Sequence, residues 1–369
     1  MGTKNFSNAN DLITFSRASG GTYLDSDGVL KLASSDIPRI EYDADGNVLG
    51  LLVEESRTNL ALNSKIGSGG SALSGWNTLG ATASAPSSYA PDGSTDGLTV
   101  TTTTNTGLNI FRQISGLSIG QTYTASMWLK GVAGQQVYFV AEDVPTGQEL
   151  VTFTGDWQRV YKTYVATATT QYLACEIYDR TAAAHLPNVT FEVWGAQYEL
   201  GAFPTSYIPT AGATATRSAD VASIPVADFG YNQSEGSVVV EGSHFETSIT
   251  DAHAAFGFDD GTSNNRMWFY HNKGQWIGST AGSTTLNVDL PDPTKYSLHR
   301  SAMCYKENDS ALTIDASSVT VDSACTVPSV DTLHIGNTGT ASTPLNGHIK
   351  SINYYPRRLT NAQLQELTT

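Results

Sequence analysis

The chain has 369 residues, of which 40% are hydrophobic and only 15% are charged, and its formal net charge is −15. This length fits two domains and a connector, and the charged fraction lies well below the usual quarter. The acidic balance argues against nucleic acid and anionic membranes as partners, because both attract clustered Lys and Arg. No apolar run reaches the roughly 18 residues that a membrane span needs.

Cysteine usage points to a reducing compartment. The three cysteines, Cys175, Cys304 and Cys325, are odd in number and widely spaced. A disulfide framework is therefore not expected, although a Cys304–Cys325 pair stays open. Residues 1–20 lack the basic start and apolar stretch of a signal peptide. We expect the chain to fold in the cytosol of the cell that makes it.

The first apolar pattern runs from Ile13 to Leu62, after a polar start. Short alternating runs are separated by Asp-Gly pairs at Asp27-Gly28 and Asp45-Gly46, which predicts β-hairpins. The two turns lack the third ligand and the distal Glu of a calcium loop, so ordinary turn chemistry is favoured over metal binding.

This segment contains three characteristic motifs, SRASGGTYLDSDG, PRIEYDADG and GLLVEESRTNL. It resembles the N-terminal segment of many structural proteins of tailed bacteriophages, where it precedes β-rich modules for carbohydrate. The resemblance implies that residues 1–62 form a virion-anchoring adaptor and that the protein resides in the virion after folding in the host cytoplasm. The docking residues it implies are Arg17, Tyr23, Arg39, Tyr42, Glu54 and Arg57.

Residues 63–208 contain seven or more alternating runs, which predicts an antiparallel β-sandwich. Its landmarks are GLSIGQTYTASMWLKG at 116–131, TGDWQRV at 154–160 and FEVWGAQYELGAFPTSYIPT at 191–210. They resemble the galactose-binding-like jelly roll of carbohydrate-binding modules. Trp128, Trp157 and Trp194 lie inside alternating runs, so we expect them in the core.

Sugar-binding modules place aromatic rings against the sugar and fix its hydroxyls with polar groups. In residues 63–208 the aromatics with polar neighbours near strand ends are Trp76 and Tyr178, the latter beside Arg180. We predict these three residues as ligand contacts.

Residues 209–234 are small residues with two prolines, which predicts a linker. Residues 235–369 again contain short β runs and end in LNGHIKSINYYPRRLTNAQLQEL. This ending resembles the last strand and short helix of concanavalin-like (laminin-G-like) lectin sandwiches. The spacing of Leu359, Leu364 and Leu367 predicts the helix, with Thr360 or Asn361 as its cap.

The densest polar-aromatic cluster of the second sandwich lies at residues 264–276. In a strand, Arg266, Trp268 and Tyr270 share one face, and Met267 and Phe269 share the other. Because the second face is more apolar, we expect the first to be exposed as a ligand-binding surface. A subunit interface and a core position remain open for it.

Catalytic and metal signatures are missing. Glu142-Asp143 and Asp259-Asp260 are adjacent pairs, not the spaced carboxylates of a glycosidase strand. The sequence also contains no nucleophile elbow, zinc-protease motif or phosphate-binding loop. We expect no enzymatic activity, no catalytic residue and no cofactor. Asp92 and Glu192 sit where jelly rolls often bind calcium, but two scattered carboxylates do not predict a metal.

Taken together, we predict an all-β chain: a hairpin adaptor, a jelly roll, a concanavalin-like sandwich and a short C-terminal helix. The predicted function is host attachment by a phage virion protein, with other virion proteins and host surface glycans as partners. A homotrimer is expected, because phage fibres and spikes commonly are trimers. A capsid decoration or head-fibre protein is the main alternative, and a polysaccharide depolymerase is the weaker one.

Overall fold

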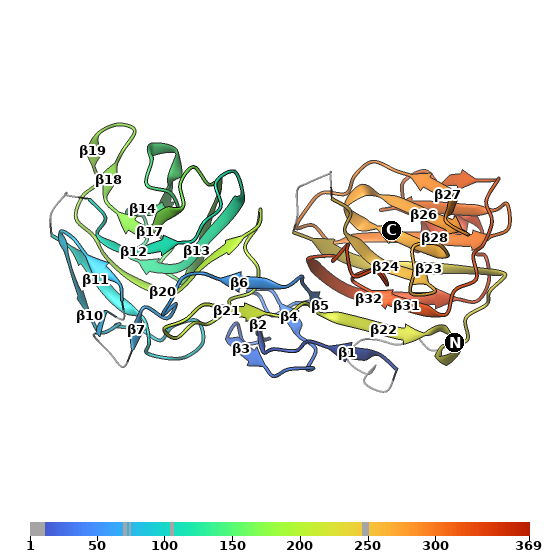
Figure 1. Ribbon diagram of the computed structural model, residues 1–369, viewed down its shortest axis with the longest axis horizontal. Helices are drawn as coiled ribbons and strands as arrows, with labels where there is room; N and C mark the ends of the chain where they lie inside the picture. Colours follow the sequence, from blue (N-terminus) through green and yellow to red (C-terminus); the bar gives the residue numbers. More distant parts are fainter. Residues whose placement is uncertain (1–11, 69–71, 74, 104–106, 246–250) are drawn as a thin grey trace. The chain divides into compact units, whose positions relative to one another are not determined.

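The computed structural model describes residues 12–68, 72–73, 75–103, 107–245 and 251–369. The predicted all-β class is confirmed: antiparallel sheets form sandwiches, and one short helix ends the chain. The chain divides into two compact units (Figure 1). We call Gly21–Leu32 with Arg57–Arg217 the middle sandwich, and Met1–Gly20, Ala33–Ser56 and Ser218–Thr369 the terminal sandwich.

The middle sandwich has two five-stranded sheets, each named here after one of its strands. The β13 sheet has the order β10 (Ala81–Ser84), β11 (Leu98–Thr102), β20 (Thr190–Leu200), β13 (Thr122–Gly131) and β16 (Gln158–Val165). The β17 sheet has the order β15 (Gln148–Thr152), β14 (Gln136–Val140), β17 (Thr170–Glu176), β12 (Ile110–Ser115) and β9 (Asn77–Thr78).

Short strand pairs complete this unit. They are β2 (Gly21–Leu24) with β3 (Leu30–Ala33), β6 (Arg57–Asn59) with β21 (Ala215–Arg217), β7 (Gly67–Ser68) with β8 (Ala72–Leu73), and β18 (Tyr178–Asp179) with β19 (Ala184–His185). A 3₁₀ turn, η2 (Pro145–Gly147), lies between β14 and β15.

The core of the middle sandwich lies between its two sheets. Alternate residues such as Val193 of β20 and Leu173 of β17 are fully buried in one hydrophobic cluster, as the period of a strand requires. On the outer face of the β13 sheet, a second cluster contains Trp194, Tyr207 and Leu30, with Trp128 and Trp157 packed against it. The chain itself therefore covers the outside of that sheet.

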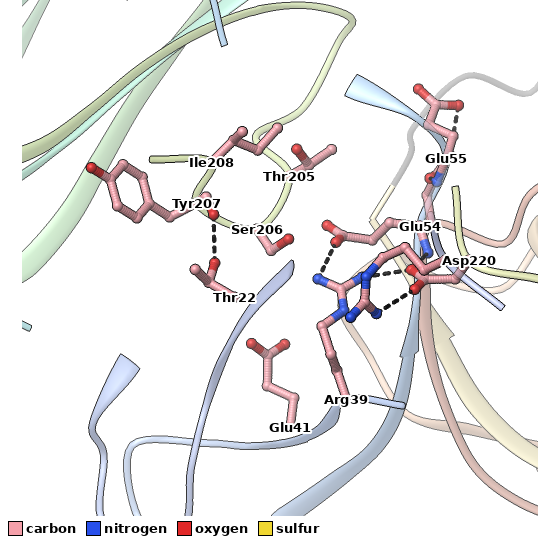
Figure 2. A network of polar contacts seen from close by, with 12 residues as sticks. Thr22, Arg39, Glu41, Glu54, Glu55, Thr205, Ser206, Tyr207, Ile208 and Asp220 are labelled. Carbon is pink, nitrogen blue, oxygen red and sulfur yellow. Dashed lines mark hydrogen bonds and ion pairs between the residues drawn. The ribbon is translucent and has the colours of Figure 1, made fainter. Parts of the chain in front are cut away.

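The motif at 191–210 includes the segment after β20, whose backbone is held by hydrogen bonds with buried side chains. The Gln197 side chain accepts a hydrogen bond from the Ile208 amide at 2.7 Å, and Glu199 accepts from the Thr205 amide at 2.9 Å. Asn59 donates to the Ile208 carbonyl at 2.8 Å. Thr22 of β2 donates to the Tyr207 carbonyl at 2.6 Å (Figure 2). Buried side chains thus satisfy the backbone of a segment outside the sheet ladder.

The terminal sandwich has two seven-stranded sheets. The β25 sheet has the order β1 (Thr14–Ser16), β22 (Val221–Pro225), β31 (Thr332–Ile335), β24 (Ala254–Asp259), β25 (Arg266–Tyr270), β26 (Gln275–Thr280) and β27 (Ser283–Asp289). The β23 sheet has the order β30 (Thr320–Asp322), β29 (Ser310–Ile314), β28 (His299–Lys306), β23 (Glu235–His244), β32 (Gly347–Tyr355), β5 (Val48–Val53) and β4 (Ile40–Tyr42). Two 3₁₀ turns are η3 (Val226–Asp228) and η4 (His271–Lys273).

The outer face of the β23 sheet is covered by the C-terminal helix α1 (Asn361–Glu366), where Leu364 packs with Val239 and Ala302. Thr360 caps this helix, and Gln363 completes a reciprocal capping box. The predicted helix and one of its two candidate caps are confirmed. Cys175, Cys304 and Cys325 are buried free thiols, so the disulfide left open by the sequence does not form.

The predicted adaptor does not form a unit of its own here. Strand β1 pairs with β22, and β5 pairs with β32, which places them in different sheets of the terminal sandwich. Strand β2 belongs to the middle sandwich. Leu51 and Val53 of β5 are buried in the hydrophobic core of the terminal sandwich. A free-standing hairpin of this length cannot provide such a core. The predicted linker 209–234 contributes strands as well, β21 and β22.

A buried ionic network holds the opening segment in the terminal sandwich. Arg39 contacts Glu54 at 2.9 Å and Asp220 at 2.5 Å (Figure 2). Asp220 also pairs with Arg17 at 3.0 Å, and these side chains are at most 1% exposed. Buried charges are tolerated only when paired in this way.

Candidate ligand-binding faces

In each sandwich one sheet is covered on the outside, and the other carries half-buried polar and aromatic side chains. In the middle sandwich this second sheet is the β17 sheet. Leu173 and Cys175 point into the core, so Tyr172, Ala174 and Glu176 point outward. Tyr138 of β14 is the strand partner of Glu176, and Phe111 of β12 is the partner of Ala174.

Three aromatic rings lie on this outward face. Phe111 and Tyr172 meet edge to face, with ring centroids 5.7 Å apart, and both are half-buried. Tyr138 is half-buried on the neighbouring strand. We call Phe111, Tyr138 and Tyr172 the aromatic face. Partly exposed rings on a rigid sheet offer the apolar surface against which a sugar ring stacks.

A fixed polar network borders the aromatic face. Glu176 is fully buried and accepts hydrogen bonds from Arg180 Nε at 2.6 Å and from Gln148 Nε2 at 2.6 Å. Arg180 also forms an ion pair with Asp143. Gln148 closes the network by accepting from the Arg180 amide at 2.9 Å. The charged groups are therefore held in place before any ligand arrives.

The Tyr138 hydroxyl donates to Asp179 at 2.7 Å. Burial, and then the hydrogen bond and negative charge of Asp179, raise the pKa of Tyr138 to about 12. The amides of Ala182 and Thr181, together with the Tyr138 hydroxyl, lower the pKa of Asp179. The phenol stays protonated and the carboxylate ionised at neutral pH, so this edge offers oriented hydrogen-bonding groups.

The β25 sheet of the terminal sandwich carries the second face. Met267 and Phe269 lie in the core, as predicted. Arg266 stacks 4.1 Å above the centre of the Trp268 ring, and Tyr270 meets that ring edge-on at 6.2 Å. Trp268 is only 3% exposed, because Arg266 lies over one side of its ring and Gly257 lies close to its edge. Of the three predicted residues, Arg266 and Tyr270 are the accessible ones.

The other predicted ligand residues lie in different surroundings. Trp76 is 3% exposed inside the middle core, and its indole N–H donates to the Asn63 carbonyl at 3.1 Å. Tyr178 is half-buried and packs against His185, with ring centroids 4.9 Å apart. Arg180 belongs to the network beside the aromatic face. The structure thus brings Tyr178 and Arg180 together and places Trp76 away from the surface.

The predicted docking residues are mostly interior. Arg17, Arg39, Glu54 and Arg57 are at most 7% exposed. The first three form the buried ionic network with Asp220, so their role here is to hold strands together. Tyr23 and Tyr42 are half-buried and are the members of the set with surface to offer a partner.

The two carboxylates considered for calcium are already compensated. Asp92 pairs with Lys65 at 3.3 Å. Glu192 accepts hydrogen bonds from the amide of Ser88 at 2.8 Å and from the hydroxyl of Ser87 at 2.9 Å. Within the described residues, no cluster of three or more His, Cys, Asp or Glu side chains has the arrangement of a metal site. None of the described helices has the length and apolar character to cross a bilayer.

Sequence reasoning missed Glu176 and Asp259 as organising carboxylates. Glu176 stands in the run LACEIY, where period-two alternation places it opposite the core residue Cys175; this was the available signal. Asp259 ends β24 and is fully buried. Its role depends on contacts with His334 and Gly339, which lie more than 70 positions away and leave no local pattern.

Comparisons with known proteins find similarity at the level of solved structures. No family model matches the chain, and no curated protein matches it. The CBM40 module of Ruminococcus gnavus IT-sialidase, bound to α2,3-sialyllactose, is 17% identical with a TM-score of 0.32, covering 37% of this chain and 84% of that one. A Trypanosoma rangeli sialidase mutant with trans-sialidase activity is 13% identical with a TM-score of 0.31, covering 40% of this chain and 25% of that one.

These neighbours are carbohydrate-binding and sialidase-type β-sandwich domains. At such TM-scores the likeness identifies neither a ligand nor an activity of this chain. The comparisons contradict the expectation that the chain is not an enzyme, because sialidases stand among its structural neighbours. Only a quarter of each sialidase chain is matched.

Proposed function

We propose that the protein is a virion structural protein of a tailed bacteriophage that attaches the particle to glycans of the host surface. The observation that carries glycan binding is the aromatic face of the β17 sheet, where Tyr138 is the strand partner of Glu176, the buried member of the Glu176–Arg180 network. The virion role is supported by the resemblance of Ile13–Ser64 to phage structural proteins.

The chemistry of the aromatic face suits a neutral saccharide. Ring edges and faces cover the apolar side of a pyranose, and fixed amide, phenol and guanidinium groups bond its hydroxyls. Of the acidic side chains described in this region, Glu176 and Asp143 pair with Arg180, and Asp179 accepts a hydrogen bond from the Tyr138 hydroxyl. Such a balance disfavours a negatively charged sugar through repulsion.

A glycan microarray probed with the intact chain tests the first part of this proposal. We expect retention of neutral bacterial saccharides and about tenfold weaker retention by Tyr172→Ala, because the loss of a stacked aromatic ring costs about 1.4 kcal/mol of binding free energy. Tyr161→Ala is the matched control: Tyr161 is 44% exposed on β16, in the other sheet of the same sandwich. Equal losses in both variants, or no retention of any glycan, would refute glycan binding by this face.

The virion role has its own test. An antibody against the intact chain, applied to purified particles of the phage that encodes it, should label the particle in negative-stain electron microscopy. Particles that lack the chain by labelling and by mass spectrometry would overturn the virion role and leave glycan binding to be judged separately.

A further inference from the structure

Arg266 is a cation without a counter-ion on the outward face of the β25 sheet. It is half-buried, and its side chain forms neither a hydrogen bond nor an ion pair with any residue that the structure describes; its Nε atom is buried and unpartnered. Its contact is the ring of Trp268, 4.1 Å away. Arg39, Arg180 and Arg358, which are also buried or half-buried, each pair with a carboxylate.

An unpaired half-buried guanidinium needs an explanation, since it carries five donors and is charged at every accessible pH. Stacking on an indole stabilises the cation but bonds none of its N–H groups. The ring of Trp268 therefore orients the guanidinium group, whose N–H donors remain available to a ligand. That combination is suited to a planar or tetrahedral oxyanion, which accepts two N–H bonds at once.

The support beneath Arg266 is rigid. The Trp268 indole N–H donates to Asp259 at 3.0 Å, which fixes the plane of the ring. Asp259 also accepts from the Gly339 amide at 2.9 Å and lies 3.2 Å from His334. A Cβ at Gly257 would come within 2.5 Å of the Trp268 ring. Strand, carboxylate and indole together hold the guanidinium in one place.

The carboxylate below the ring does not occupy the site. Asp259 is fully buried, and its two oxygens accept from Gly261, Gly339 and Trp268. On the outward side of the same sheet, Tyr270 is half-buried and the side chain of His334 is 19% exposed. These offer a phenol, an aromatic edge and an imidazole to a ligand that the arginine holds.

We propose that this face, which we call the Arg266 site, binds an acidic saccharide, with the carboxylate or sulfate group accepting from the guanidinium of Arg266. This inference rests on the proposed glycan-binding function. It concerns the other sandwich and a different class of saccharide. A polyanion such as nucleic acid does not fit, because the chain carries a net charge of −15.

The test compares acidic saccharides with their neutral counterparts on the intact chain: 3′-sialyllactose with lactose, trigalacturonate with its methyl ester, and sulfated with unsulfated disaccharides. We expect each bound acid to lose about 10- to 100-fold in affinity in Arg266→Gln, the range for a lost charge-assisted pair. Arg266→Lys keeps the charge without the fork, so we expect about a tenfold loss. Arg357→Gln is the control, since Arg357 is exposed on the same sandwich and forms no ion pair with a described residue.

The outcomes separate this inference from the proposed function. Acid binding that falls in the Arg266 variants and persists in Tyr172→Ala supports the Arg266 site. Acid binding that is unchanged in Arg266→Gln and Arg266→Lys, or no preference for any acid over its neutral partner, overturns it while leaving the aromatic face untouched. If Arg266→Gln loses its native near-UV spectrum, Arg266→Lys decides the matter. Absence of binding to all saccharides overturns both proposals.

Discussion

The carboxylate of Asp220 accepts a hydrogen bond from Arg17 at 3.0 Å, although the two residues are 203 positions apart. Its second oxygen contacts Arg39, which in turn pairs with Glu54. Residues of the opening segment therefore fold together with a strand region from the middle of the chain. Much of the opening segment is therefore part of the framework of the terminal sandwich, whereas its strand β2 belongs to the middle sandwich.

The buried network should be sensitive to the loss of its shared carboxylate. Asp220→Asn removes the negative charge that neutralises Arg17 and Arg39. We expect it to lower the free energy of unfolding of the terminal sandwich by about 3–5 kcal/mol. Urea unfolding followed by circular dichroism measures it. Glu235→Gln removes an ion pair with Lys306 whose side chains are 31% and 50% exposed, and it should change stability by less than about 1 kcal/mol. Similar small effects in both variants would contradict a structural role of the network.

The histidines of the terminal sandwich should make it acid-sensitive. Burial, and then the charges of His253 and His299, lower the pKa of His244 to about 4; its ring nitrogen also lies 3.0 Å from that of His271. Because the folded-state pKa lies below the unfolded value near 6.5, the unfolded chain takes up the proton first. This stabilisation is complete above pH 6.5 and is lost as the pH falls towards 4, amounting to roughly 3 kcal/mol.

The pH effect is measured as the difference in unfolding free energy between pH 7 and pH 5. We expect His244→Gln to lose about 2 kcal/mol less over this interval than the unmodified chain. His185→Gln, at an exposed position, should behave like the unmodified chain. An identical pH dependence in all three proteins would show that His244 is not the responsible group.

The support of the Arg266 site predicts a strict requirement for glycine at position 257. In Gly257→Ala the added Cβ would lie 2.5 Å from the Trp268 ring, so the indole must move. We expect a destabilisation of about 1–3 kcal/mol together with a changed near-UV tryptophan signal. A fully stable variant with an unchanged spectrum would mean that the ring has room to spare.

How far the sequence predicts this molecule is seen best at β25. Alternation alone places Met267 and Phe269 inward and Arg266 outward, because the period of a strand is local information. The pairing of β5 with β32 spans about 300 positions. The contact of Asp259 with Trp268 depends on the position of Asp259, which is the last residue of the strand next to β25. Such relationships follow from strand order, which local patterns do not encode. Trp76 shows the same limit, since polar neighbours in sequence did not keep it out of the core.

The thiols provide a test of the packing in both sandwiches. Burial raises the pKa of Cys304 to about 12 and also raises the pKa of Cys175 and Cys325. Since the thiolate is the reactive form, we expect no reaction with a disulfide reagent at pH 8 in the native state and three equivalents after unfolding in urea. Rapid labelling of a native thiol would indicate a local opening of the corresponding core.

Hydroxyl-radical footprinting of the intact chain with a neutral saccharide selected on the microarray tests the central claim, glycan binding at the aromatic face, most directly. Oxidation of side chains is read out by mass spectrometry with and without saturating ligand. We predict protection of Tyr138 and Tyr172, with Tyr161 unchanged. Saturating ligand that leaves Tyr138 and Tyr172 as reactive as before would contradict the claim and place the glycan site elsewhere on the chain.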